Sequence, residues 1–167
     1  ARLKIMPLPA ELQFNNGSIQ ITEKFGITFD NEPGARLKKA VDRFYEQLEE
    51  KTGFSFTGRS GGQLVITNPA GPSSFPQLGE NESYELMIKG AKITLKASSD
   101  SGILYGLETL LQLAEYSSDQ WYFPELELKD HPRYPWRGLM IDVSRHWIPK
   151  DVILRNLDAM AKLKMNV

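Results

Sequence analysis

The sequence predicts an α+β fold, in which an antiparallel-rich sheet carries two helices on one face and a short strand–helix unit follows. Strand-like segments of alternating polarity and two segments of helical periodicity occur without strict β–α alternation, which is typical of helices gathered on one face of a sheet. The composition then changes after Lys129, because four of the ten prolines fall between residues 124 and 149. We therefore predict an α+β domain over residues 1–130, and a linker with a second structural unit over residues 131–167.

Length and charge exclude several classes of protein. The chain has 167 residues, with 20 Lys+Arg against 21 Asp+Glu, and this balance argues against a nucleic-acid partner because such proteins usually carry a basic excess. No apolar run approaches the roughly 18–20 residues of a membrane-spanning helix, so we expect no membrane span. The absence of cysteine excludes disulfides and cysteine-based zinc sites. The two histidines, His131 and His146, do not supply a His-rich metal site, so we expect no metal.

The first third of the chain predicts short strands and one helix. Residues 11–14 are extended in pattern, and Asn16-Gly17 predicts a tight hairpin turn because Asn and Gly tolerate positive φ. The strand pattern continues over residues 26–29. Over residues 33–51, apolar side chains recur at helical spacing, with a proline near the start and a glycine just past the end. This segment predicts an amphipathic helix with one buried stripe.

The middle of the chain predicts a strand, a hairpin and a second helix. Residues 63–67 form a short apolar run, and a loop rich in Pro, Gly and Ser follows it. Residues 84–89 and 92–97 both alternate apolar and polar side chains around a glycine, which predicts a hairpin. Three side chains at 98–100 offer N-cap oxygens to a helix that we expect to run to about Tyr116.

The C-terminal region predicts a strand over about 121–128 and then a separate strand–helix unit. An apolar strand covers 137–143, a helix covers 150–164, and residues 165–167 look like the start of another strand. A lone strand–helix unit cannot bury both faces of its strand, so we interpret the C-terminus as a cut. The apolar side chains left without partners would then favour self-association.

Four charged or ionisable side chains lie on and just after the 137–143 strand: Arg137, Asp142, Arg145 and His146. Charge on a buried strand is costly unless it is paired, so each of them needs a partner or a ligand. One interpretation is that Asp142 pairs with Arg145 or Arg137 and ties the strand end to its surroundings. Strict alternation places Arg137 and Asp142 on opposite faces, so without a bulge the two cannot reach one pocket. The residues alone leave open whether the cluster is structural or binds a ligand.

Two glycine motifs have a structural interpretation. Residues 58–62 match the G-x-S-x-G pattern of a nucleophilic serine, but a strand follows them where that motif needs a helix, so we interpret them as a turn. Gly102 and Gly106 form a small-xxx-small pair on the second predicted helix. We interpret that pair as close packing of the helix on the sheet, because the segment is too polar for a membrane.

Three segments carry the motifs of a known family. The most specific is WRGLMIDVSRHW (136–147), followed by a proline and a helix that ends in KLKMNV. The second is SYELMIKGAKITLKASSDSGILYGLETLLQL (83–113), and the third is the opening IMPLPAELQF. Together they resemble glycoside hydrolase family 20, the β-N-acetylhexosaminidases. The first segment is similar to the start of the family's catalytic barrel, and the other two are similar to the α+β accessory domain that precedes it.

This resemblance implies a fold and a reaction. Residues 131–167 would be a linker and the first β-strand and helix of a truncated (β/α)8 barrel, a fold that takes about 250 residues. The family's reaction is the retaining removal of terminal β-linked N-acetylglucosamine or N-acetylgalactosamine, in which the substrate's own 2-acetamido oxygen attacks the anomeric carbon. The resemblance implies no cofactor. It implies N-acetylhexosamine-containing glycans as partners and favours a secreted or periplasmic location for the full-length protein.

The resemblance also assigns residues. Arg137 matches the family's arginine that binds sugar hydroxyls in the −1 subsite. Asp142, Arg145 and His146 match the family pattern, and we expect them to support the site without a direct catalytic role. The family's catalytic Asp-Glu pair would lie beyond Val167, so we expect no catalytic residue in this chain and no activity from the chain by itself.

A different class of function remains open at this stage. The chain could be a non-catalytic carbohydrate- or protein-binding module, or a structural module, whose C-terminal segment merely resembles a barrel strand. Residues 1–130 do not concentrate aromatic residues as a sugar-stacking face would, so we expect that domain to brace a barrel.

Overall fold

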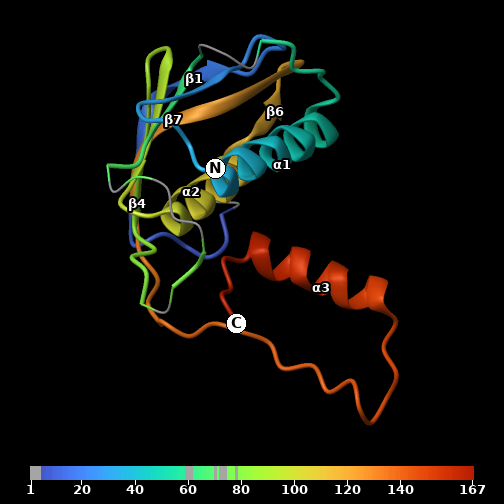
Figure 1. Ribbon diagram of the computed structural model, residues 1–167. Coiled ribbons are helices and arrows are strands. Elements are labelled where there is room, and N and C mark those ends of the chain that lie inside the picture. Colours follow the sequence, from blue (N-terminus) through green and yellow to red (C-terminus); the bar gives the residue numbers. More distant parts are fainter. Residues whose placement is uncertain (1–4, 59–61, 70, 72–74, 78) are drawn as a thin grey trace. The chain divides into compact units, whose positions relative to one another are not determined.

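The computed structural model describes residues 5–58, 62–69, 71, 75–77 and 79–167, and it divides into two compact units, Ala1–His131 and Pro132–Val167. In Figure 1 the second unit is coloured from orange to red and contains α3 (Lys150–Lys162). Three residues of the serine motif, 59–61, lie outside the described residues. Within the described part of the chain, no helix combines the length and apolar character needed to cross a membrane.

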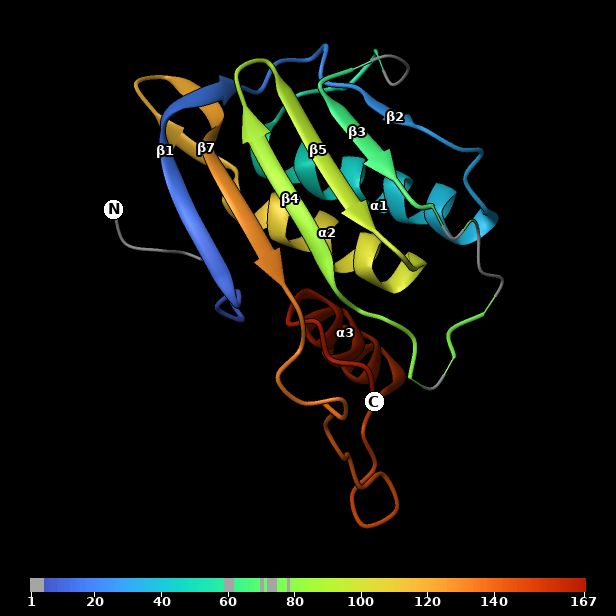
Figure 2. The ribbon, with the colours of Figure 1, turned by 90° about the vertical axis from the view of Figure 1, so that its left-hand side faces the viewer.

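The first unit is built on a mixed sheet, which Figure 2 shows face-on. Its seven described strands are β1 (Glu11–Gln20), β2 (Ile27–Phe29), β3 (Leu64–Thr67), β4 (Tyr84–Lys89), β5 (Lys92–Ala97), β6 (Glu115–Ser117) and β7 (Gln120–Asp130). Their order in the sheet is β1-β7-β4-β5-β3-β2, and β6 pairs with β7. Only β2–β3 and β3–β5 are parallel among these pairs, so the sheet is antiparallel-rich, as predicted.

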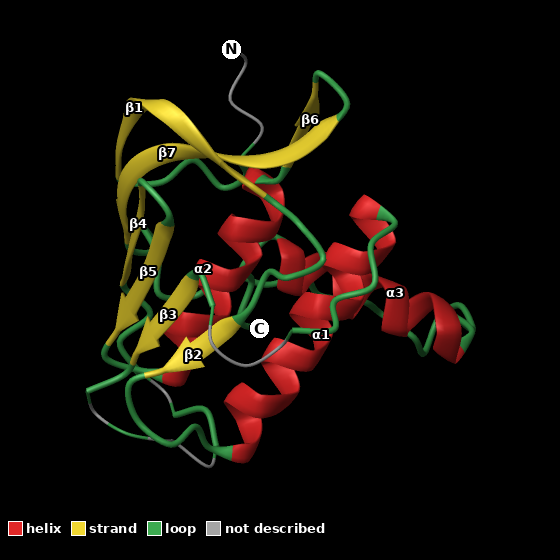
Figure 3. Ribbon diagram, turned by 90° about the horizontal axis from the view of Figure 1, so that it is seen from above, coloured by secondary structure: helices red, strands yellow, loops and turns green. Residues whose placement is uncertain are grey.

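Two helices, α1 (Ala35–Thr52) and α2 (Asp100–Leu113), cover one face of this sheet (Figures 2 and 3). The central strands alternate buried and exposed positions, because successive side chains of a strand point to opposite faces. Leu86 and Ile88 of β4 and Leu95 of β5 therefore enter the core beneath the helices, where α1 contributes Phe44 and Leu48. The predicted α+β class is confirmed.

Helix α2 lies unusually close to the sheet because two of its residues lack a side chain. A Cβ atom on Gly102 would lie 2.5 Å from the Ser83 carbonyl oxygen and 2.7 Å from the Ala97 Cβ. A Cβ on Gly106 would lie 2.2 Å from Leu95 Cδ1. The close packing predicted from the small-residue pair is confirmed.

The end of α2 differs from the prediction. The helix ends at Leu113 instead of about Tyr116, because residues 115–117 form β6 and return into the sheet. Tyr116 pairs with Trp121 across the hairpin, and their ring centroids are 5.3 Å apart. Ser118 and Asp119 both have positive φ, at 51° and 61°, which is the backbone geometry of a tight two-residue hairpin turn.

The hairpin predicted at Asn16-Gly17 is wrong. Both flanking segments belong to one strand, β1, since Phe14 pairs with Leu126 and Ser18 pairs with Pro124 of the same partner strand. Asn16 and Gly17 therefore form a bulge. The partner strand favours an irregularity here because Pro124 has no N–H to donate to a ladder. Gly17 does have positive φ, 151°, so its backbone freedom was correctly predicted although its role was not.

Near the C-terminal end of the motif over residues 83–113, the side chain of Gln112 binds the backbone of Met6. The backbone N–H of Met6 donates to Gln112 Oε1 at 2.7 Å, and Gln112 Nε2 donates to the Met6 carbonyl oxygen at 3.0 Å. One side-chain amide of α2 thus holds both polar groups of a backbone residue 106 positions earlier in the sequence. Within the first unit, this contact ties the opening IMPLP segment to α2.

Replacing Gly102 tests the close approach of α2. Helix propensity alone predicts that Gly102→Ala stabilises the protein by about 1 kcal/mol. The contact with the Ser83 carbonyl predicts the opposite, and we expect the free energy of unfolding in urea to fall by about 1–3 kcal/mol. Gly58→Ala is the control, because its Cβ would have its nearest neighbours at 3.7 Å. A Gly102→Ala protein as stable as the wild type would contradict the packing argument.

Replacing Tyr84 tests a buried polar network. Its hydroxyl lies 2.6 Å from Thr109 Oγ1 and donates to Asp130 Oδ2 at 2.8 Å. Burial, and then the negative charge of Asp130, raise the pKa of the Tyr84 phenol far above its usual value of 10.0. We expect Tyr84→Phe to lower the free energy of unfolding by about 0.5–1.5 kcal/mol at neutral pH.

The same network predicts a dependence on pH. The native state keeps the Tyr84 phenol neutral. Its contribution to the free energy of unfolding is therefore fully present below pH 10, and it is lost as the pH rises and this phenol ionises in the unfolded chain. The stability difference between the wild type and Tyr84→Phe should therefore be constant near neutrality and should shrink above pH 10. Tyr116→Phe, at an exposed tyrosine, is the control and should leave the free energy of unfolding at neutral pH within about 0.5 kcal/mol of the wild type. Parallel slopes for the wild type and Tyr84→Phe would count against this network.

Candidate substrate-binding site

The second unit holds all four predicted site residues, and Arg137 has the most constrained position. The side chain is half-buried. Its Nε donates to the Lys164 carbonyl oxygen at 3.0 Å, and its Nη1 donates to the Tyr134 carbonyl oxygen at 2.7 Å. Two hydrogen bonds from one planar guanidinium group fix the orientation of its plane.

The main chain of Arg137 is held by the last residues of the chain. The Val167 N–H donates to the Arg137 carbonyl oxygen at 3.1 Å, and the Leu139 N–H donates to the Val167 carbonyl oxygen at 3.3 Å. This is the slanted pattern of a parallel strand pair, with Gly138 opposite Val167. Helix α3 thus joins two segments that pair in parallel, although neither is long enough to form a strand, and residues 165–167 were predicted as the start of a second strand.

Gly138 is required by this pairing. A Cβ atom on it would lie 2.3 Å from the Val167 carbonyl oxygen and 2.8 Å from Val167 Cβ. Any side chain at position 138 would push the two segments apart. The glycine of the Trp-Arg-Gly motif is therefore explained by the close approach of the neighbouring backbone.

The prediction of a strand over residues 137–143 is wrong, because the structure has no strand there. The pairing extends only over 137–139, and residues 143–145 form a turn. A strand of a parallel sheet forms a regular ladder between two neighbours, and this segment pairs with the short stretch 166–167 alone among the described residues.

Asp142 and Arg145 form a local turn. Asp142 Oδ1 accepts hydrogen bonds from the Ser144 N–H at 2.9 Å, the Ser144 hydroxyl at 2.8 Å and the Arg145 N–H at 3.2 Å. The hydrogen bonds from Ser144, its hydroxyl first, lower the pKa of Asp142. Arg145 Nε lies 3.2 Å from Asp142 Oδ2. Of the two pairings considered from the sequence, the structure therefore shows Asp142 with Arg145 and not with Arg137.

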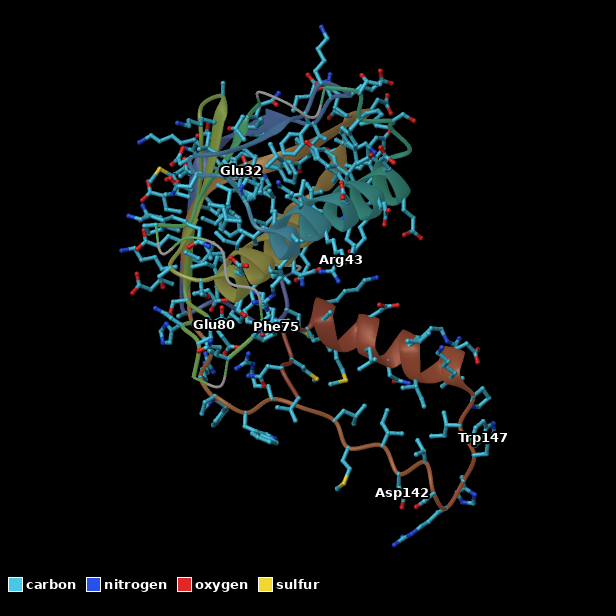
Figure 4. The ribbon with its side chains drawn as sticks, in the orientation of Figure 1. Glu32, Arg43, Phe75, Glu80, Asp142 and Trp147 are labelled. Carbon is cyan, nitrogen blue, oxygen red and sulfur yellow. The ribbon has the colours of Figure 1, made fainter. Side chains whose placement is uncertain are left out.

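The remaining predicted residue, His146, is exposed and follows this turn. Asp142 and Trp147 lie on the loop that precedes α3 (Figure 4), and 86% of Trp147 is exposed. An exposed ion pair such as Asp142–Arg145 contributes little to stability, so the turn is ordered mainly by its hydrogen bonds. Across the residues that the structure describes, no three His, Cys, Asp or Glu side chains gather in a metal-binding group.

One residue of this site was not identified from the sequence. Asn166 Oδ1 accepts a hydrogen bond from the Arg137 N–H at 2.9 Å, and Asn166 Nδ2 donates to the Pro135 carbonyl oxygen at 2.9 Å. The sequence showed only that Asn166 could begin a strand. A signal was available in retrospect: Asn166 lies in the segment expected to pair with the one that contains Arg137, and a carboxamide can both donate to and accept from backbone groups.

Comparison with known proteins identifies both units. Residues 2–131 match the model of glycosyl hydrolase family 20, domain 2, and residues 134–167 match the catalytic domain of the same family. The β subunit of mouse β-hexosaminidase is 44% identical over an alignment that covers all of this chain and 34% of that protein. β-Hexosaminidase subunit B1 of Dictyostelium discoideum is 32% identical and aligns with 97% of this chain and 30% of its own length.

Solved structures of proteins of the same family have the same fold as this chain. The chitobiase of Flavobacterium johnsoniae superposes on 99% of this chain with a TM-score of 0.89 and 40% identity, and the match covers 26% of that protein. The β-hexosaminidase of Streptomyces plicatus gives a TM-score of 0.78 at 26% identity, with 98% of this chain and 33% of that one covered. The chain thus spans about a third or less of the length of these relatives. By its sequence and its fold, the chain belongs to glycosyl hydrolase family 20.

Proposed function

We propose that the protein carrying this chain is a retaining exo-β-N-acetylhexosaminidase, which removes terminal β-linked N-acetylglucosamine or N-acetylgalactosamine. The observation that carries the proposal is the placement of Arg137, whose backbone is paired and whose guanidinium is oriented within the segment that matches the catalytic domain. The relatives support the substrate class. They are named hexosaminidases and chitobiases, and a mutant of the S. plicatus enzyme was solved with its product GlcNAc.

In this proposal Arg137 binds the sugar. A guanidinium group has five N–H donors, so one side chain can be oriented by two backbone carbonyls and also donate to sugar hydroxyls. Hydrogen bonds from a charged donor contribute about 1.5–3 kcal/mol each. The Asp142–Arg145 turn and His146 support this end of the catalytic domain and take no direct part in the reaction.

The bond-breaking step belongs to residues outside this chain. In the family's mechanism the substrate's acetamido oxygen attacks the anomeric carbon while a Glu protonates the leaving oxygen, and the Asp before it orients the acetamido group. The 167 residues contain no Asp-Glu dipeptide. We therefore assign binding to this chain, and catalysis to the part of the protein that it does not include.

We assign a bracing role to the domain over residues 1–130, which precedes the unit over 131–167. The face of its central strands opposite the helices carries exposed charged side chains, such as Glu85 and Lys96, where a sugar-stacking surface would need aromatic rings. Lys129 Nζ lies 3.8 Å from Glu85 Oε1 on neighbouring strands. This charge pairing suits a solvated face better than a glycan-binding face.

An activity assay tests the function and the role of Arg137 together. In the full-length protein, Arg137→Ala should lower kcat/KM for 4-nitrophenyl N-acetyl-β-D-glucosaminide by about 10- to 150-fold. This loss corresponds to one hydrogen bond from a charged donor. Arg137→Lys should recover only part of the activity lost in Arg137→Ala, because an ammonium group does not reproduce the planar fork of donors. Arg133→Ala, at an exposed arginine in the same segment, is the matched control and should keep full activity.

The same assay separates the chain from the whole protein. The 167-residue chain by itself should release 4-nitrophenol no faster than buffer. A wild-type full-length protein without turnover would overturn the proposed function. Turnover by the isolated chain would overturn the assignment of catalysis to residues outside it.

The isolated chain should also self-associate. Apolar side chains of the second unit are exposed, including Met140 at 93% and Leu139 and Leu157 at 52% each. Since exposed apolar patches drive association, sedimentation should show a mass that rises with concentration. The double variant Met140→Gln, Leu157→Gln should shift the distribution toward monomer. A wild-type chain that stays monomeric at all concentrations would contradict this prediction.

A further inference from the structure

We propose that Asn166 is a positioning residue for Arg137, whose amide side chain takes the place of a missing backbone partner in the parallel pairing. This inference rests on the proposed function, since it concerns the arginine that binds the sugar. Asn166 itself touches no substrate in this proposal and acts through Arg137.

The pairing register shows which partner is missing. With Gly138 opposite Val167, a regular parallel ladder would continue one rung toward Pro135. In that rung the Arg137 N–H would donate to the Met165 carbonyl, and the Met165 N–H would donate to the Pro135 carbonyl. The Met165 N–H instead donates to the Met160 carbonyl oxygen at 2.9 Å, because Met165 is still engaged with the end of α3.

The side chain of Asn166 supplies both halves of that rung. Its Oδ1 accepts from the Arg137 N–H at 2.9 Å, and its Nδ2 donates to the Pro135 carbonyl oxygen at 2.9 Å. A carboxamide has the same acceptor and donor as a peptide group, so it can replace the peptide of Met165. The backbone N–H of Asn166 also donates to the Arg137 carbonyl oxygen at 2.8 Å. One residue therefore holds Arg137 at both its N–H and its C=O.

The orientation of the Arg137 guanidinium also depends on the segment that contains Asn166. Arg137 Nε bonds to the carbonyl oxygen of Lys164, two residues before Asn166. Lys164 has a positive φ of 58°, which turns the chain between α3 and the paired segment. Loosening the contact at Asn166 would free the Arg137 backbone and disturb the carbonyl that orients its side chain. A misplacement of about 1 Å in a substrate-binding group can cost about 100-fold in rate.

Other side chains do not reproduce this arrangement. Aspartate keeps the acceptor for the Arg137 N–H but has no donor for the Pro135 carbonyl. Glutamine has the correct groups on a side chain that is one methylene longer. Alanine has neither group and leaves both backbone groups without this partner.

A double-mutant cycle in the full-length protein tests the proposal, with 4-nitrophenyl N-acetyl-β-D-glucosaminide as substrate. When Arg137 is present, Asn166→Ala should lower kcat/KM by about 10-fold. In an Arg137→Ala background the same change should cost less than about 2-fold, because the group that it positions is gone. When Arg137 is present, the kcat/KM of Asn166→Asp should lie between that of the wild type and that of Asn166→Ala. Asn156→Ala, which removes a side-chain contact with the Val152 carbonyl on α3, is the matched control and should keep the wild-type kcat/KM.

The double-mutant cycle also distinguishes a failure of the positioning role of Asn166 from a failure of the proposed function. Equal losses from Asn166→Ala in both backgrounds would mean a merely structural role and would overturn the positioning role alone. Full activity of Asn166→Ala would overturn it as well. If Asn166→Ala does not fold in a urea titration, the Asn166→Asp variant takes its place in the cycle, and equal losses in both backgrounds again overturn the proposal. An inactive wild type, or an Arg137→Ala variant with full activity, would instead overturn the function proposed for this site.

Discussion

Two hydrogen bonds between backbone segments on either side of α3 hold the site together. Val167 donates to the Arg137 carbonyl, and Leu139 donates to the Val167 carbonyl. Gly138 permits the approach, since a Cβ there would overlap the Val167 carbonyl oxygen. The two carbonyls that orient the Arg137 guanidinium belong to the ends of these same segments. Without the pairing, a long charged side chain would have several rotamers in place of one direction.

The first unit follows the same physical rule in a larger core. Gly102 and Gly106 allow α2 to approach β4 and β5 more closely than any residue with a side chain would permit. The apolar side chains beneath α1 and α2 then fill one continuous core. Tyr84 joins this core to the end of β7, because its buried hydroxyl donates to Asp130, the last residue of that strand. Close backbone approach, made possible by glycine, therefore organises each unit of the chain.

The errors of sequence reasoning have a common cause. Asn16-Gly17 looks like a hairpin turn because its local preference for positive φ is real, and Gly17 does have that backbone geometry. The segment became a bulge because both of its flanks pair with β7, more than 100 positions later in the sequence. The helix expected to reach Tyr116 ends early because Tyr116 pairs with Trp121 instead. In both places a tertiary or cross-strand partner overrode a local propensity.

The sequence by itself determined both long helices of the first unit, the β4–β5 hairpin and the packing role of the α2 glycines, and its family motif singled out Arg137 as the candidate for sugar binding. Each of these depends on periodicity or on a motif within a short stretch of chain. Only the tertiary structure decided that Asn16-Gly17 is a bulge, that Asp142 pairs with Arg145, and that Asn166 completes the pairing beside Arg137. The hydrogen bond between Arg137 and Asn166 joins residues 29 positions apart. An asparagine has the same composition and local propensity whether or not a backbone group lies within reach of its amide, so only the folded chain could reveal that role.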